Sequence, residues 1–441
     1  MLLVLLAIIW IILSTRQFNL HPVWALLSAC LIVGLGSGHS VAEVVNAITR
    51  GFGGLLGGIG LVIVLGAILG VILEQTGGAI TLADGILRTL GKRYPGLAMG
   101  AIGSLVSIPV FCDSAFIVLS RINHALAGRT KVAAPTLFLS LAGGLYLTHN
   151  LVPPTPGPVA AAGNLGLSEQ LGPIIVIGLA VSVPVLLIAW WWARKAGRNI
   201  LLEAEDLETG SANDVDSPVT SVGHGIPSLL RVLPVLLVPI FLLALGTLLP
   251  KGTPWQWVAI PEIALAIGVF LAFALLGQHR RKQWRSWTET GIALAGPILV
   301  ITGVGGSFGA VLKNTDIVAQ ATDWLGNNQD QGWVMLLAAF ALAAILKMAQ
   351  GSSTSALVVG SSVFAPLLIG LDGLSIWQQS LMVTSLGAGA MVVSHANDSY
   401  FWVVTQFSGF KVADAYRSYT LMTLWMGLGT FVICLGLFLI L

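Results

Sequence analysis

The chain has 441 residues, of which 56% are hydrophobic and only 9% are charged, and its formal net charge is +2. A water-soluble protein needs about 25% charged residues to cover its surface, so this composition excludes a soluble globular protein and indicates a polytopic membrane protein. The three cysteines, Cys30, Cys112 and Cys434, lie far apart in apolar or motif segments, so we predict neither a disulfide nor a zinc site.

The N-terminal apolar segment, at 2–14, has no basic region before it and no small-residue cleavage site after it. We therefore expect a retained first helix rather than a cleaved signal peptide. Further apolar segments follow along the whole chain, with lengths typical of membrane spans and of shorter re-entrant segments. They fall at about 20–37, 51–74, 95–110, 115–127, 133–150, 171–193, 229–249, 259–277, 290–312, 332–349, 355–370, 378–393 and 419–441.

One long polar stretch, at 195–227, interrupts this series. It carries six acidic residues among Gly, Ser and Asn: Glu203, Glu205, Asp206, Glu208, Asp214 and Asp216. We interpret it as a solvated linker, and a docking peptide is the alternative. No segment is large enough to form a separate soluble domain.

The two parts of the chain on either side of this linker resemble each other. The sequence GVILEQT at 70–76 aligns with GAVLKNT at 309–315, an offset of 239 residues, and the same offset brings 111–114 onto 350–353. With a further gap of seven residues, His149 meets His395. Three matches in the same order indicate an internal duplication.

The distribution of Lys and Arg indicates that the two copies are inverted. If each copy has three spans, a re-entrant hairpin, a broken helix and a final span, 17 of the 21 Lys and Arg fall on one side of the membrane. Cytoplasmic loops retain basic residues, so this side is the cytoplasm. We expect a multi-pass protein of the bacterial inner membrane with both termini on the periplasmic side.

The sequence therefore predicts an all-α membrane protein with a first inverted repeat at 1–194, a cytoplasmic linker at 195–227 and a second inverted repeat at 228–441. Each repeat contains a hairpin and a broken helix. The hairpins are expected at about 95–127 and 332–370, and the broken helices at about 133–166 and 378–408.

Four polar, Gly-rich or Pro-rich interruptions lie inside apolar surroundings, at 109–114, 149–158, 350–355 and 394–399. Backbone outside a helix cannot face lipid, because each unsatisfied polar group costs several kcal/mol there. Paired breaks in two inverted halves are typical of a transport site near the bilayer midplane. Helix N-termini that end at such breaks offer free N–H groups, which suit a carboxylate.

Two acids at these breaks, Asp113 and Asp398, lie where a charge is costly, and a carboxyl so placed takes up a proton more easily than one in water. We predict that one of them carries a coupled proton; the alternative is a structural helix cap. Substrate hydrogen bonds are predicted for His149, Asn150, Thr155, Gly351, Ser352, Ser353, Thr354, His395 and Asn397. The alternatives are packing histidines and hydroxyls that only link helices. Lys347 is either a substrate counter-ion or the partner of an Asp or a carbonyl.

Three motifs resemble the signature stretches of the gluconate permease (GntP) family: PPTPGP at 153–158, QGSSTSA at 350–356 and SHANDSYFW at 394–402. The similarity extends over essentially the whole chain. It implies a member of the ion-transporter superfamily with a scaffold domain, a transport domain, an elevator-type mechanism and a homodimeric state. Asp113 then matches a hairpin acid that is often Glu in the family, and Thr155 stands where many members have His.

This resemblance implies a secondary active transporter of the gluconate:proton symporter type, which imports gluconate or a related sugar acid, with glycerate as a smaller alternative. A sodium-coupled carboxylate transporter is the main rival, because hydroxyl-rich tips also coordinate sodium; a D-serine permease of the same family is another. We expect an organic acid anion and membrane lipid as partners, no nucleic acid, no cofactor and no catalytic residues. An intramembrane hydrolase would need a nucleophile–base or metal set, and we expect neither a His-Glu-x-x-His motif nor a Gly-x-Ser-x-Gly motif on a spanning helix.

Overall fold

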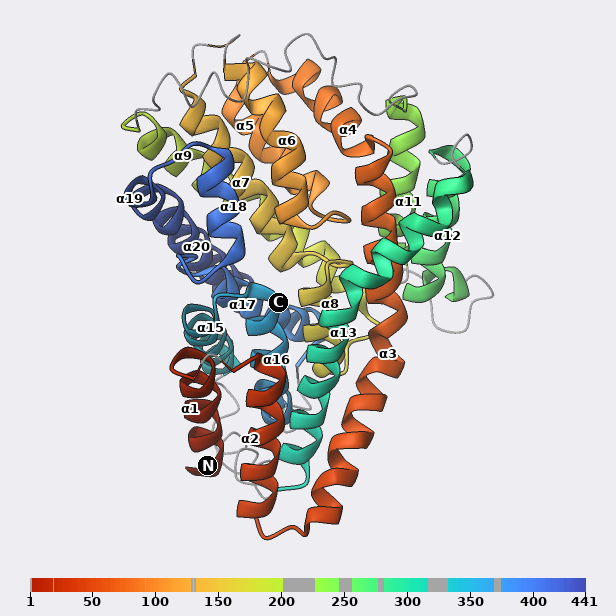
Figure 1. Cartoon of the computed structure of the whole chain (residues 1–441), viewed down its shortest axis with the longest axis vertical. Coiled ribbons are helices and arrows are strands. Elements are labelled where there is room, and N and C mark those ends of the chain that lie inside the picture. Colours follow the sequence, from red (N-terminus) through yellow and green to blue (C-terminus); the bar gives the residue numbers. More distant parts are fainter. Residues whose placement is uncertain are drawn as a thin grey trace.

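The computed structural model describes residues 2–18, 20–91, 93–127, 130, 132–200, 227–245, 256–276, 281–315, 332–368 and 374–441. Within these ranges all regular secondary structure is helical (Figure 1). Most of the predicted linker, residues 201–226, lies outside the described residues.

The helices fall into two groups on either side of that segment. The first group is α1 (Leu2–Arg16), α2 (Pro22–Gly36), α3 (Val41–Gln75), α4 (Gly78–Ile86), α5 (Pro95–Val106), α6 (Cys112–Ala127), α7 (Ala134–Leu151), α8 (Pro156–Asn164) and α9 (Leu171–Gly197). The second is α11 (Leu229–Leu245), α12 (Pro261–Leu275), α13 (Trp284–Lys313), α15 (Gly332–Gln350), α16 (Ser353–Leu368), α17 (Ile376–Met391), α18 (Ser399–Phe407), α19 (Val412–Ala415) and α20 (Leu421–Phe438). Short π-helical turns, Leu87–Gly91 and Tyr416–Thr420, follow α4 and α19.

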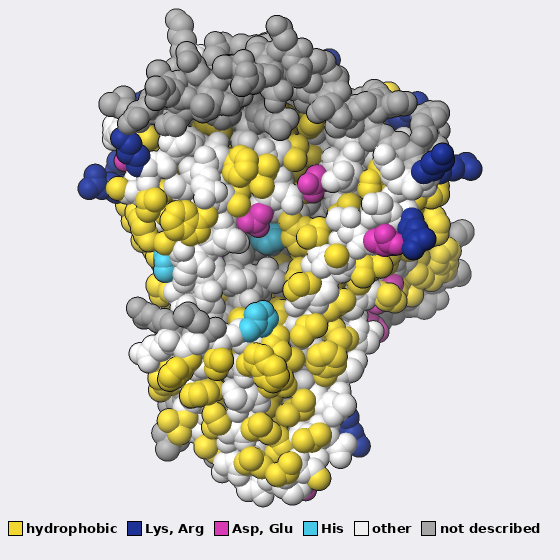
Figure 2. Space-filling model, in the orientation of Figure 1, with side chains coloured by type: hydrophobic (Ala, Val, Ile, Leu, Met, Phe, Trp, Pro, Cys, Tyr) yellow, Lys and Arg dark blue, Asp and Glu magenta, His cyan; other side chains and the backbone are white. Residues whose placement is uncertain are grey.

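Five helical segments among the described residues are long and apolar enough to cross a membrane. They are Val41–Gln75, Leu171–Gly197, Arg281–Lys313, Gly332–Gln350 and Val412–Phe438. On the face drawn in Figure 2, hydrophobic side chains are spread over the middle and lower parts among uncharged surface, and most of the visible Lys and Arg side chains lie toward the upper end. Because apolar side chains in contact with lipid carry no hydration penalty, this distribution suits a protein embedded in a bilayer.

The longest helices, α3 and α13, cross the molecule side by side in opposite directions (Figure 1). Ser40 begins α3 with a capping box, in which the Ser40 hydroxyl accepts from the backbone N–H of Glu43 and the Glu43 carboxylate accepts from the backbone N–H of Ser40. The Ser307 hydroxyl of α13 donates to the Ile48 carbonyl at 2.9 Å. A Cβ atom on Gly51 would lie only 2.5 Å from the Gly306 carbonyl oxygen, so glycine is required for this close backbone approach.

Helices of the two groups have matching neighbours. Helix α1 packs on α2 as α11 packs on α12, α5 packs on α7 as α15 packs on α17, and α7 packs on α9 as α17 packs on α20. Contacts between the groups also match, because α2 packs on α13 and α12 packs on α3. These paired contacts show that the two groups share the same pattern of neighbouring helices.

The chain forms two helical hairpins and two interrupted helices inside the protein. The chain turns back between α5 and α6 and between α15 and α16, where Gly351 adopts a positive φ of 81°. Helix α7 is interrupted before α8, and α17 before α18. From Pro135 to Leu151, every residue of α7 is buried, so this interrupted helix runs through the core of the molecule.

Candidate functional site

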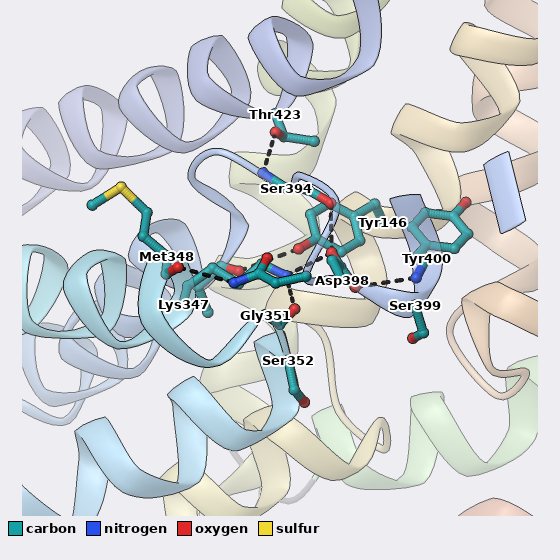
Figure 3. Close-up of polar contacts among 12 residues, drawn as sticks. Tyr146, Lys347, Met348, Gly351, Ser352, Ser394, Asp398, Ser399, Tyr400 and Thr423 are labelled. Atoms are coloured by element: carbon teal, nitrogen blue, oxygen red, sulfur yellow. Dashed lines mark hydrogen bonds and ion pairs between the residues drawn. The ribbon is translucent and has the colours of Figure 1, made fainter. Parts of the chain in front are cut away.

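A buried ion pair joins the second hairpin to the second helix break (Figure 3). The Lys347 ammonium lies 2.6 Å from Asp398 Oδ2, and the side-chain exposures are 0% and 6%. Lys347 also donates to the Gly351 carbonyl at the hairpin tip and lies 5.8 Å from the centroid of the Tyr146 ring. Of the two interpretations of Lys347 left open by the sequence, pairing with an Asp and a carbonyl is therefore the one the structure shows.

Besides the Lys347 ammonium, two other groups donate hydrogen bonds to Asp398. The Ser394 hydroxyl donates to Asp398 Oδ2 at 2.5 Å, and the backbone N–H of Tyr400 donates to Oδ1 at 3.1 Å. The second contact makes Asp398 the N-cap of α18. Ser394 is fixed in turn because its backbone N–H donates to the Thr423 hydroxyl at 3.0 Å. A buried carboxylate with these partners has both oxygens engaged.

Asp113 lies close to this pair but has weaker partners. It is in the first turn of α6, and its Oδ1 accepts from the hydroxyl of Ser399, the residue after Asp398, at 3.4 Å. The Cys112 thiol donates to Oδ2 at 3.6 Å. No Lys or Arg among the described residues forms an ion pair with Asp113, in contrast to Asp398. The structure therefore brings the two predicted acids together at the meeting point of the first hairpin and the second break.

The four helix N-termini at the breaks meet in two pairs, each with one helix from each half. Helix α6 packs on α18, and this pair carries Asp113 and Asp398. Helix α8 packs on α16, where a Cβ on Gly157 would lie 3.7 Å from the Thr354 Cα. The second pair has no acid in either first turn, and its first turns carry Thr155, Ser352 and Ser353 instead. Helix N-termini with hydroxyl groups and no acid favour an anion.

A narrow opening of about 10 Å³ lies where α3 meets the first hairpin and the first break. It is lined by Gly66, Ala67, Pro109, Val110, Phe111, His149, Pro154, Thr155 and Pro156. Among the described residues, the buried Nδ1 of His149 has no hydrogen-bond partner, and neither has the Asn150 side-chain oxygen. Because buried polar atoms are almost always paired, these atoms are suited to a ligand.

Other predicted residues are divided between the hairpin tip and helix caps. The Asn397 amide donates to the Met348 carbonyl at 2.9 Å, and the Asn397 backbone lies against Gly351, so both belong to the contact between the second hairpin and the second break. Ser352 is exposed, and its hydroxyl accepts from the Ser355 N–H as a cap of α16. The half-exposed ring of His395 makes no hydrogen bond to another residue of the described chain.

The predicted equivalence of His149 and His395 is wrong. His149 lies within α7, before its last residue Leu151, whereas His395 lies beyond the end of α17 at Met391. The reason is that the two breaks differ in length and chemistry: the first is short and rich in proline, and the second is longer and polar. By position in the break, the N-cap Thr155 of α8 corresponds to the N-cap Asp398 of α18.

Two features were missed at the level of sequence. Both side-chain amide atoms of Gln350 are buried without a partner among the described residues, which makes Gln350 a further candidate ligand; its place at the start of the QGSSTSA motif was the available signal. The expectation that no Gly-x-Ser-x-Gly motif lies on a spanning helix is wrong, because this pattern, typical of hydrolase nucleophiles, occurs at 305–309 in α13. Its serine, Ser307, is buried and donates to the Ile48 and Gly303 carbonyls, so it serves helix packing and is no nucleophile.

Comparisons with known proteins agree with these observations. A model of the GntP family of permeases matches residues 1–440. The inner membrane permease YgbN of Escherichia coli K12 is 31% identical over 442 residues, which cover 97% of this chain and 95% of that protein. The gluconate permease of Pseudomonas aeruginosa is 30% identical over 432 residues, which cover 95% and 93%.

A solved structure shows the same fold. The YdaH transporter of Alcanivorax borkumensis aligns over 95% of this chain and 98% of its own, with a TM-score of 0.66 at 18% sequence identity. The long apolar helices and the match to a family of permeases identify a multi-pass membrane transporter rather than an enzyme. The chain belongs to the GntP family of permeases.

Proposed function

We propose that this permease imports a small hydroxy-carboxylate, such as gluconate or a related sugar acid, by symport with a proton. The observation that carries the proposal is the division of the site into two helix-terminus pairs. One pair, α8 with α16, offers N-termini and hydroxyls without an acid, and the other, α6 with α18, holds both acids and the buried lysine. Such a division supports one place for an anion and another for the coupled proton.

The substrate carboxylate would bind at the N-termini of α8 and α16. Lys347 is unsuited to bind it, because its ammonium is already paired with Asp398. Pro156 and Pro158 have no N–H, so α8 contributes its dipole and the N–H of Gly157, and α16 contributes its dipole and the N–H groups of Ser353 and Thr354. Helix dipoles and N–H groups of this kind can replace a cationic side chain, as they do at many anion sites. The buried polar atoms of His149, Asn150 and Gln350 that have no partner among the described residues would accept or donate hydrogen bonds to the substrate hydroxyls.

The proton would be carried by Asp113. Asp398 is already bonded to an ammonium, a hydroxyl and a backbone N–H, so a proton would have to displace one of them. Asp113 accepts only one long hydrogen bond from Ser399 and a weak one from the Cys112 thiol. A carboxylate with few competing donors is the better acceptor for a transported proton.

The environment of Lys347 supports proton coupling over the sodium-coupled alternative. Its ammonium is a monovalent cation bound by a carboxylate and by a backbone carbonyl at an interrupted helix. Carbonyls and carboxylates at such breaks are the ligands that a transported sodium ion uses in other carriers. A lysine fixed at this place supplies the positive charge permanently, so no external cation is needed there.

For the whole carrier, we propose inverted repeats at 1–194 and 228–441, with the basic end facing the cytoplasm and both termini facing the periplasm. Contacts near the termini support this orientation, since Leu3 lies by Gly36 and Phe438 lies by Gly332, at loops poor in basic residues. The hairpins and broken helices would form a transport domain that moves against a scaffold containing α3 and α13, and the carrier would be a homodimer.

Uptake into proteoliposomes tests the proposed function. Purified protein is reconstituted, and accumulation of radiolabelled gluconate, glycerate and D-serine is followed under an imposed pH gradient, a sodium gradient or neither. We expect accumulation of a hydroxy-carboxylate with the pH gradient alone. Accumulation that requires sodium would reject proton coupling, and preference for D-serine over every hydroxy acid would reject the proposed substrate class.

A further inference from the structure

A second cavity, remote from the helix breaks, lies where the N-termini of α5 and α7 meet the C-terminal end of α9. It measures about 410 Å³ and is open to solvent. Its lining consists of Arg93, Tyr94, Pro95, Gly96, Val132, Ala133, Thr136, Trp190, Arg194 and Arg198. None of these residues is acidic, so the cavity concentrates positive charge.

The three arginines have no acidic partner in the described parts of the chain. Ion pairs there involve Arg88, Arg285 and Lys347 but none of the arginines of the cavity. The Arg93 guanidinium lies 5.4 Å from the centroid of the Tyr94 ring, and that of Arg194 lies 5.3 Å from the Trp190 ring. Stacking on an aromatic ring orders a guanidinium and leaves its N–H donors available to an anion.

Two helix N-termini add further N–H donors and the positive ends of two helix dipoles to the cavity. Helix α5 begins at Pro95 and α7 at Ala134, and the N-cap residues, Tyr94 and Ala133, provide no side-chain hydrogen bond to either helix. Pro95 and Pro135 have no N–H, and the Thr136 N–H donates to the Ala133 carbonyl, so the donors that need a partner from outside the helix are the N–H groups of Gly96, Leu97 and Ala134. Arginines that converge on two uncapped N-termini form a site for a doubly or singly charged oxyanion.

The geometry points to a binding site for a phosphate group in this cavity. Its aromatic wall, Tyr94 and Trp190, is of the kind found where helices leave the hydrocarbon, and basic pockets between such helices bind the headgroups of anionic phospholipids. The same donors would bind a soluble phosphate. A bound phosphate group would link the start of the first hairpin to α9. This phosphate site is separate from the proposed substrate site.

The test compares three forms of the full chain purified in detergent. They are the parental protein, the cavity variant (Arg93→Gln, Arg194→Gln, Arg198→Gln) and a matched variant (Arg281→Gln, Lys282→Gln, Arg417→Gln) that removes the same charge from exposed positions outside the cavity. Native mass spectrometry measures binding of phosphatidylglycerol, with phosphatidylcholine as the reference lipid. A parallel calorimetric titration with inorganic phosphate distinguishes a soluble source from a lipid.

We expect the parental protein to bind one phosphatidylglycerol tightly per chain. The cavity variant should bind phosphatidylglycerol with an affinity lower by on the order of a hundredfold, because each arginine removed costs about tenfold or less. The matched variant should bind as the parental protein does. Saturable inorganic phosphate binding that depends on the same arginines, without a preference for phosphatidylglycerol, would support the site with a soluble ligand. Equal binding of phosphatidylglycerol and of phosphate by the cavity variant and the parental protein would overturn the proposed site. The single variant Arg198→Gln repeats the measurement with a smaller change, in case the triple variant misfolds.

Discussion

Asp113 and Asp398 lie in the same part of the protein, but their surroundings differ. Asp398 has an ammonium, a hydroxyl and a backbone N–H as partners, whereas Asp113 has one long hydrogen bond from Ser399 and a weak one from a thiol. A fully bonded buried carboxylate is a structural element, and a poorly bonded one can change its protonation state at lower cost. The two acids should therefore respond differently to the same Asp→Asn change.

In proteoliposomes, Asp113→Asn should abolish accumulation driven by a pH gradient, because the amide cannot bind and release the coupled proton. Exchange of internal for external substrate at equal pH should persist, since exchange needs no net proton movement. Glu169→Gln, which neutralises an exposed acid in a loop, is the control and should keep both activities. Loss of exchange together with accumulation in Asp113→Asn would show that Asp113 binds substrate rather than the proton.

Asp398→Asn should instead unfold the protein at lower temperature, because it leaves the Lys347 ammonium buried without a counter-charge. Breaking a buried pair from one side costs about 3–5 kcal/mol. The double variant Asp398→Asn, Lys347→Met removes both charges and should recover part of that loss. Thermal unfolding in detergent measures both, and a double variant less stable than Asp398→Asn would contradict a structural role for the pair.

At the residue scale, the sequence predicted the acids and most hydroxyls correctly as members of the breaks, because a polar residue is conspicuous in an apolar segment. It did not predict their partners. Lys347 and Asp398 are far apart in the chain, and so are Asp113 and Ser399, so which acid receives the ammonium depends on tertiary packing. Gln350 was missed because the lack of a partner for a buried amide is visible only in three dimensions.

Among the secondary-structure elements, the tip of the second hairpin has the tightest fit to its neighbour. Gly351 has a positive φ of 81°, and a Cβ there would lie 2.0 Å from the Asn397 carbonyl oxygen. The tip also provides the carbonyl that accepts from Lys347. A side chain at this position would therefore separate the hairpin from the second break.

Gly351→Ala should lower stability by roughly 1–3 kcal/mol from backbone strain alone and should weaken substrate binding further. Gly360→Ala is the matched control in the same hairpin, since its added methyl group would meet the nearest atom at an ordinary 3.5 Å. This control should be neutral or stabilising by up to about 1 kcal/mol, because alanine favours the helix. Thermal unfolding and substrate-induced thermal shift measure the two effects, and equal behaviour of both variants would rule out the proposed fit.

The positions of the breaks could be read from the chain because proline, glycine and polar clusters at 149–158 and 394–399 end helices by local chemistry. The lengths of the breaks could not, and the erroneous pairing of His149 with His395 arose from that. Packing of α6 on α18 and of α8 on α16 joins segments from opposite halves, and no local pattern specifies which helix ends meet.

For the whole molecule, charge balance leads to a prediction about the driving force. In the proposed mechanism, the pair of Lys347 and Asp398 stays neutral overall, and Asp113 is negative without the coupled proton and neutral with it. One bound proton and one monovalent carboxylate therefore leave the loaded carrier with the same charge as the empty carrier. Translocation should move no net charge across the membrane.

Accumulation in proteoliposomes should accordingly follow the pH gradient and be unaffected when valinomycin and potassium impose a membrane potential. The same experiment with Glu169→Gln should give the same result, because that acid lies outside the site. Accumulation that grows with an inside-negative potential would instead require a second proton per substrate and would exclude Asp113 as the sole carrier.

Each helix-terminus pair takes one member from each half of the chain, so neither half by itself contains a complete pair. An ancestral gene with a single copy would have made a protein unable to transport alone. It would have needed a second subunit inserted in the bilayer in the opposite direction, and therefore a nearly even balance of basic residues between its two sides. In the proposed duplication, fusion of the two copies removes that requirement, and each half can contribute different groups to a shared pair, as Asp113 comes from the first half and Asp398 with Lys347 from the second.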